Sequence, residues 1–101
     1  MTLNEFQKVA REHLIYPEMG KNVVIPSLGI AGESGEVVER IKKVLRDKDG
    51  VFSEDDKNYV ARQLGDLLGY IAALASEIGA GLDDVAEGQL ELLKKRATLR
   101  K

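Results

Sequence analysis

Three glutamates near position 36 and one later aspartate are the residues whose spacing points to chemistry. Glu33, Glu36 and Glu39 are three residues apart, so in a helix their carboxylates line one edge. Asp66 is the only charged residue in the apolar run 65–75, and we expect it to be largely buried. Burying a carboxylate is costly unless it is paired, hydrogen-bonded or bound to a metal. Carboxylates converging from two helices therefore predict a site for a hard cation.

Gln63 precedes Asp66 by three residues and supplies the same spacing from the second helix. Helix pairs that each contribute ligands at i and i+3 build metal sites in bundle cores. Oxygen ligands suit Mg²⁺, with Mn²⁺ as a second option, and these ions retain waters and bind phosphate. Two other interpretations stay open. Glu36 and Glu39 are also consistent with a solvated face that pairs with Arg40 and Lys43, and Asp66 with a buried carboxylate bonded to Tyr, Gln or Arg.

Composition excludes several classes of protein. The 101 residues suit one domain, 1–101, and the formal net charge of −2 argues against a nucleic-acid binder that works by phosphate neutralisation. The absence of cysteine excludes disulfides, zinc–thiolate sites and thiol nucleophiles. No apolar stretch is long enough to span a membrane, and the first residues lack the pattern of a secretory signal. These features predict a soluble, cytoplasmic protein that binds neither nucleic acid nor membrane.

Hydrophobic periodicity and capping residues predict four helices, at 3–14, 27–47, 54–78 and 82–99. Thr2 with Glu5 and Ser53 with Asp56 have the spacing of capping boxes for the first and third helices. Both prolines lie in the segment 15–26, which we expect to be a loop. No convincing strand pattern is present, so the fold class is all-α.

The second and third helices have more apolar surface than four short helices need internally. Helix 27–47 is amphipathic, and Glu33 lies at the border of its apolar arc. Helix 54–78 has one apolar arc and a second face of small residues, and three residues fall near Asp66 on its wheel: Tyr59, Tyr70 and Glu77. We therefore predict a helical bundle that is completed by dimerisation or by assembly into a tetramer.

The acidic stretches resemble those of the MazG-like all-α nucleotide pyrophosphohydrolases. The resemblance is carried by SLGIAGESGEVVERIKK at 27–43 and QLGDLLGY at 63–70, where the family has E-x-x-E on one helix and E-x-x-D on the next. Segment 79–96 is similar to the closing helix of the family, so the resemblance covers nearly the whole chain. It implies Mg²⁺-dependent hydrolysis of nucleoside triphosphates to monophosphate and pyrophosphate, a house-cleaning role on nucleotides, and assembly as dimers or dimers of dimers.

The resemblance also assigns roles to individual residues. It makes Glu33, Glu36 and Asp66 metal ligands. Glu39 becomes a candidate to hold a second metal or to orient the attacking water, and Lys43 a candidate phosphate contact. Glu36 and Glu39 are thus the predicted catalytic residues. Further substrate contacts are predicted at His13, Tyr16 and Tyr70.

This chain departs from the family pattern at three positions. Gln63 stands where the second motif has glutamate, which makes it a neutral metal ligand and removes one of four negative charges from the site. In the closing helix, Gln89 and Leu92 align where the family often has asparagine and lysine, which removes a phosphate contact. The departures leave a second functional hypothesis open: a module that binds nucleotide or metal without turning it over.

Overall fold

The computed structural model describes residues 1–100, which form four helices. They are α1 (Leu3–His13), α2 (Val24–Asp47), α3 (Glu54–Glu77) and α4 (Leu82–Leu99). The predicted all-α class and all four helices are confirmed. Both predicted capping boxes are present, at Thr2 with Glu5 and at Ser53 with Asp56.

Helix α2 begins three residues earlier than predicted. Asn22 Oδ1 accepts hydrogen bonds from the backbone N–H groups of Val24 and Ile25, which caps the helix before Pro26. Pro26 is thus the third helical residue, where the N–H that proline lacks would have no partner within the helix. Helices α1 and α3 each end one residue before the predicted end.

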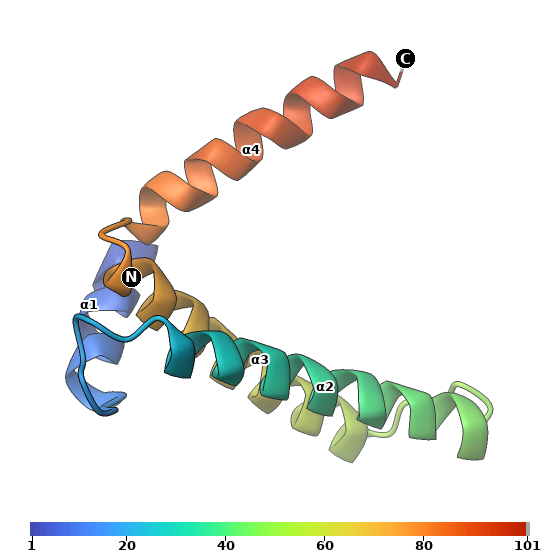
Figure 1. Cartoon of the computed structure of the whole chain (residues 1–101). Coiled ribbons are helices and arrows are strands. Elements are labelled where there is room, and N and C mark those ends of the chain that lie inside the picture. Colours follow the sequence, from blue (N-terminus) through green and yellow to red (C-terminus); the bar gives the residue numbers. More distant parts are fainter. Residues whose placement is uncertain (101) are drawn as a thin grey trace.

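Helices α2 and α3 form a long antiparallel hairpin (Figure 1). Asp56 closes its turn and is 1% exposed. The Asp56 carboxylate accepts hydrogen bonds from Arg40 at 3.1 Å and Lys48 at 2.8 Å, and the Arg40 guanidinium also stacks on the Tyr59 ring. Lys48 and the backbone of Ser53 hold the pKa of Asp56 well below its usual range. These contacts fix the register of the two helices that carry the acidic residues.

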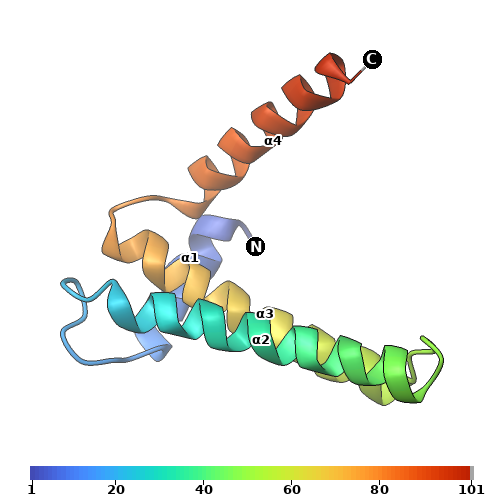
Figure 2. The same cartoon turned by 45° about the vertical axis from the view of Figure 1, so that its right-hand side comes forward.

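Helix α1 packs against the last turns of α3, at the end of the hairpin opposite Asp56. The small core there consists of Ala72, Ala75 and Leu82, with Phe6 and Ala10 packed against it from α1. Figure 2 shows α1 on the far side of α3 from α2. The segment between α1 and α2 therefore has to cross α3 to join them.

Helix α4 contacts α1 near its N-terminus and then projects away, so that α4 and the hairpin form a V (Figures 1 and 2). Two side chains of α1 hold its first turn. Gln7 Oε1 accepts the N–H of Leu82 at 2.9 Å, and Asn4 Oδ1 accepts the N–H of Asp83 at 2.9 Å. Gln7 Nε2 also donates to the carbonyl of Ala80, which fixes the bend between α3 and α4.

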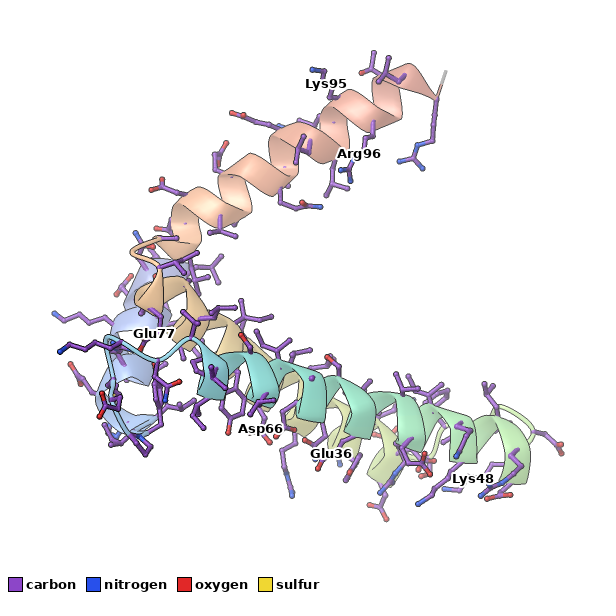
Figure 3. All side chains as sticks on the ribbon, in the orientation of Figure 1. Glu36, Lys48, Asp66, Glu77, Lys95 and Arg96 are labelled. Carbon is purple, nitrogen blue, oxygen red and sulfur yellow. The ribbon has the colours of Figure 1, made fainter. Side chains whose placement is uncertain are left out.

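Most large apolar side chains of residues 1–100 are not covered by the single chain. Six hydrophobic residues are buried and twenty large ones are exposed, most of them on α2, α3 and α4 (side chains in Figure 3). This imbalance agrees with the apolar surplus seen in the sequence, although the predicted assembly itself stays a prediction. No helix in this part of the chain is both long and apolar enough to cross a membrane.

Candidate metal and phosphate site

Two buried oxygens without partners mark the seam between α2 and α3. They are Glu33 Oε2 and Gln63 Oε1, and no other side-chain polar atom buried within residues 1–100 lacks a hydrogen-bond partner. Gln63 is only 8% exposed. A buried acceptor without a partner loses the hydrogen bonds that it had with water. Both oxygens are therefore suited to bind a cation or a hydrogen-bond donor in place of that water.

The carboxylates around this seam are close enough to affect one another. Burial raises the pKa of Glu33, and the negative charges of Glu36 and Asp66 raise it further. Like charges held together favour protonation or the binding of a cation. The three carboxylates that the sequence predicted as metal ligands are thus neighbours in the structure.

The expected burial of Asp66 is wrong, because Asp66 is exposed. It lies at the edge of the hairpin, and Figure 3 places it with Glu36 on the side turned away from α4. Among residues 1–100 no three acidic or histidine side chains converge closely enough to hold a metal ion. The oxygen donors are of the type that binds Mg²⁺, but in this structure they do not all converge on one point.

Glu39 lies on a solvated part of α2. It pairs with Lys42 at 3.0 Å and with Lys43 at 4.0 Å, and all three side chains are about half exposed or more. The hydrogen bond from Lys42 lowers the pKa of Glu39. The alternative interpretation of Glu39 as one member of a surface ion pair with Lys43 is therefore confirmed. The alternative pair of Glu36 with Arg40 is replaced by the bond of Arg40 to Asp56.

A depression of about 220 Å³ lies next to the acidic seam, toward the hairpin turn. Its walls carry three cations and two anions: Arg40, Lys43, Lys48, Asp47 and Asp56. Lys43 follows Glu36 by seven residues, which places it about 10 Å farther along the helix axis on nearly the same side. Arg40 and Lys48 are both paired with Asp56, so the depression carries mixed charges beyond the carboxylates.

The three predicted substrate contacts fall in different environments. The Tyr70 ring packs directly on Gly29 in the seam, next to the carboxylates. His13 is exposed at the end of α1. Tyr16 is 8% exposed, and its hydroxyl donates to Glu77 while accepting from Arg11 at 2.8 Å. Through these bonds, Tyr16 attaches the segment between α1 and α2 to Glu77 of α3.

Glu77 is the residue whose role the sequence did not reveal. Its carboxylate accepts from the backbone N–H groups of Gly20 at 2.8 Å and Asn22 at 2.9 Å, and from Arg11 at 3.1 Å. These bonds and that of Tyr16 anchor the segment 14–23 to α3. Glu77 lies eleven residues from Asp66 on nearly the same side of α3, so the anchored segment forms one end of the carboxylate side of the hairpin.

Comparison with known proteins identifies the family to which this chain is similar. The MazG nucleotide pyrophosphohydrolase domain matches residues 27–99, which include nearly all of α2 and the whole of α3 and α4. This chain belongs to the MazG family. The predicted resemblance is thereby confirmed, and the acidic seam lies within the matched part.

One relative of this MazG domain is "Gene 37 protein" of Mycobacterium phage L5. The two are 33% identical over 101 residues, which cover 95% of this chain and 89% of the phage protein. No solved structure matches the chain. Helix α1 and the anchored segment 14–23 lie outside the range matched by the MazG domain, so one end of the seam is bounded by residues that the family match does not describe.

Proposed function

We propose that this MazG domain is a Mg²⁺-dependent hydrolase that converts nucleoside triphosphates to monophosphate and pyrophosphate, with Mn²⁺ able to replace Mg²⁺. The observation that carries the proposal is the pair of buried oxygens without partners, Glu33 Oε2 and Gln63 Oε1, beside Glu36 and Asp66. The family membership supports the same activity.

The donor set fits a hard cation. Glu33 and Gln63 would hold it from the two sides of the seam, and Glu36 and Asp66 would complete the set from the exposed edge. Bound there, Mg²⁺ supplies neutralisation of phosphate charge and a lowered pKa of water. Gln63 contributes an oxygen without a charge, so we expect weaker binding of the ion than four carboxylates would give.

The two ends of the hairpin would bind different parts of the substrate. Lys43 and the depression that it lines lie where the β- and γ-phosphates would extend from the seam, and a lysine there attracts them as a point charge. Tyr70 and the anchored segment 14–23 lie toward the other end, where the nucleoside would bind. His13 is exposed at the start of that region and is proposed as a further contact.

Glu36 is the carboxylate best suited to accept the proton of the attacking water. It is exposed next to Glu33, whereas Glu39 is paired with Lys42, which makes Glu39 a weaker base. The water oxygen bonds to the α-phosphorus while the bond to the bridging oxygen of the α–β anhydride breaks. Pyrophosphate leaves with that oxygen, and the proton passes to Glu36.

Chromatography of products from a panel of NTPs and dNTPs tests the proposal. The wild type should release monophosphate and pyrophosphate, and Glu36→Gln and Asp66→Asn should each lower turnover about 100-fold or more, as loss of groups around a metal does. Glu54→Gln and Asp55→Asn make the same charge changes at the exposed start of α3 and should keep full activity. Unchanged turnover in either seam variant would refute the assignment.

Gln63 favours a second candidate function, a module that binds nucleotide or metal without hydrolysis. Gln63→Glu separates the two: it should restore hydrolysis to an inert wild type under this candidate, whereas under the first the wild type is already active. In both cases Mg²⁺ should raise the melting temperature by binding the folded form, and Gln63→Glu should increase that effect at equal Mg²⁺. A melting temperature independent of Mg²⁺ would indicate a purely structural bundle.

A further inference from the structure

Gln63 brings an amide into the seam, and the two ends of an amide bind different groups. Its side chain is 8% exposed, and its oxygen Oε1 is buried without a hydrogen-bond partner. An ionised glutamate at this position would offer two acceptor oxygens, whereas glutamine offers one acceptor oxygen and two N–H donors. Glutamine in place of glutamate therefore removes a negative charge from the seam and at the same time adds a hydrogen-bond donor to it.

The nitrogen Nε2 is the end of this amide that a ligand can reach. Within residues 1–100 no group of the protein is bonded to Nε2, and Nε2 is not one of the two buried side-chain atoms that lack a partner. Nε2 therefore keeps contact with solvent, while Oε1 lies inside the seam. The neighbouring Glu36 and Asp66 are exposed too, so a ligand that arrives at their edge of the seam meets the donor of Gln63.

Gln63 also lies between the carboxylates and the depression near the hairpin turn. Asp66 follows it by three residues, and Asp56, which lines the depression, precedes it by seven. Along the axis of α3, Gln63 is thus about 4.5 Å from the level of Asp66 and about 10 Å from the level of Asp56. At about 100° per residue, Gln63 and Asp56 lie within about 20° of each other around the helix. Phosphates that extend from the carboxylates toward the depression therefore pass Gln63.

We propose that Gln63 Nε2 donates a hydrogen bond to a phosphate oxygen of the substrate, while Gln63 Oε1 helps to hold the cation. The inference rests on the proposed function, which supplies the ligand, a phosphate bound beside a divalent cation. The amide is polarised when its oxygen binds a cation, so its N–H groups become stronger donors. Hydrogen bonds to a charged acceptor are also stronger than those between neutral groups. Gln63 is then a substrate-binding residue as well as a neutral metal ligand.

Substitution separates the two groups of the Gln63 amide. Gln63→Glu keeps an oxygen, adds a charge and removes the donor, so its affinity for Mg²⁺ should rise. In saturating Mg²⁺ it should nevertheless bind inorganic pyrophosphate about 10-fold or more weakly than the wild type, as expected for loss of a hydrogen bond to a charged group. Gln63→Met has neither group and should bind both ions more weakly. Asn58→Asp makes the same amide-to-carboxylate change at an exposed position of α3 and should change neither affinity. Calorimetric titration measures both affinities.

Nuclear magnetic resonance observes the donor itself. The chain has three asparagines and three glutamines, and the side-chain amide signal that is missing from the spectrum of Gln63→Glu identifies Gln63. Addition of pyrophosphate to the wild type in saturating Mg²⁺ should move one amide proton of Gln63 downfield from its position with Mg²⁺ alone. The signal of Asn58, identified in the same way from Asn58→Asp, should stay in place. An amide proton of Gln63 that does not respond to bound pyrophosphate would overturn the inference.

Two other results would overturn it as well. The first is an unchanged or higher affinity for pyrophosphate in Gln63→Glu or Gln63→Met, which would leave Gln63 as a metal ligand without a donor role. The second is a folded wild type that does not bind pyrophosphate in saturating Mg²⁺. The proposed function fails by a different observation: a wild type that binds both ions with the expected amide shift, yet hydrolyses no nucleotide, would refute hydrolysis and leave the role of Gln63 standing.

Discussion

Glu77 shows how one carboxylate organises a segment of the chain through bonds that are local in space and distant in sequence. Its oxygens accept from two backbone N–H groups, Arg11 and Tyr16. These donors all favour the charged form, and they lower the pKa of Glu77 to about 2, with the Tyr16 hydroxyl the largest contributor. The loop that bounds the proposed nucleoside end of the seam therefore depends on the ionisation of a single residue.

The shifted pKa of Glu77 predicts how stability depends on pH. A carboxylate whose pKa is lower in the folded state stabilises that state at pH values above the unfolded pKa of about 4.5, and this contribution is lost as the pH falls toward 2. Glu77→Gln should therefore lower the melting temperature at pH 7, and the difference from the wild type should shrink below pH 4.5. Thermal denaturation followed by circular dichroism measures this. Glu91→Gln, an exposed glutamate of α4, is the control. A difference that is constant from pH 7 to pH 2 would contradict the prediction.

The sequence predicts the positions of some site residues on their helices, but it does not predict the exposure of Asp66 or the contacts of Glu77. The spacing of Glu33 and Glu36 places both on one edge of α2, because the helical period fixes which side chains share an edge. The influence of Asp66 on Glu33 depends instead on how α3 packs against α2. The exposure of Asp66 was missed, since a run of apolar neighbours along a helix does not show which sides other helices cover. The anchoring role of Glu77 was missed as well, because its partners come from residues more than fifty positions earlier in the chain.

At the scale of helices, the Tyr70 ring of α3 lies directly against Gly29 of α2. A Cβ atom at position 29 would overlap the Tyr70 ring, so only glycine allows the ring to lie in the seam at this level. The close contact brings the first turns of α2 onto α3 just before Glu33. The packing of α2 against α3 at this level therefore depends on the absence of a Cβ atom at position 29.

Substitution of this glycine should separate the helices. Gly29→Ala should destabilise the protein by about 1–3 kcal/mol, the usual cost of inserting a methyl group into a packed contact. Gly32→Ala, one turn later with nothing near its Cβ position, should instead stabilise by about 0.5–1 kcal/mol through helix propensity. Urea denaturation of both variants measures the contrast. Equal effects of the two substitutions would show that the Tyr70 contact does not set the spacing.

Helix limits were the most predictable part of the fold. Thr2 and Ser53 mark their starts through side-chain caps that act within three residues, so the information is local. The start of α2 differs from the prediction because Pro26, which the sequence predicts to lie in a loop, is helical. Asn22 caps this start by accepting hydrogen bonds from the N–H groups of Val24 and Ile25. Because Val23 separates Asn22 from the helix, the usual spacing of a capping residue does not reveal it.

For the whole molecule, the exposed apolar side of the hairpin predicts a dependence of assembly on Leu64. Leu64 is 50% exposed in the single chain, and Leu64→Glu would place a charge within the expected interface between copies. The variant should sediment as a monomer, whereas the wild type should sediment as a dimer or tetramer. Val51→Glu, a similar change in the turn between α2 and α3, should not alter the wild-type assembly. A monomeric wild type would remove the basis of the prediction.

The hydrogen bonds of Gln7 and Asn4 to the start of α4 predict the order in which the parts of the molecule fold. They join residues more than seventy positions apart, whereas the hairpin joins helices that follow one another directly. Closing a long loop costs more entropy, so contacts of high sequence separation form late. Helix α1 precedes the other three helices in the chain, yet it should gain its partners on α3 and α4 last. The hairpin with its acidic seam should form early, and the angle of the V should be set in the final step of folding.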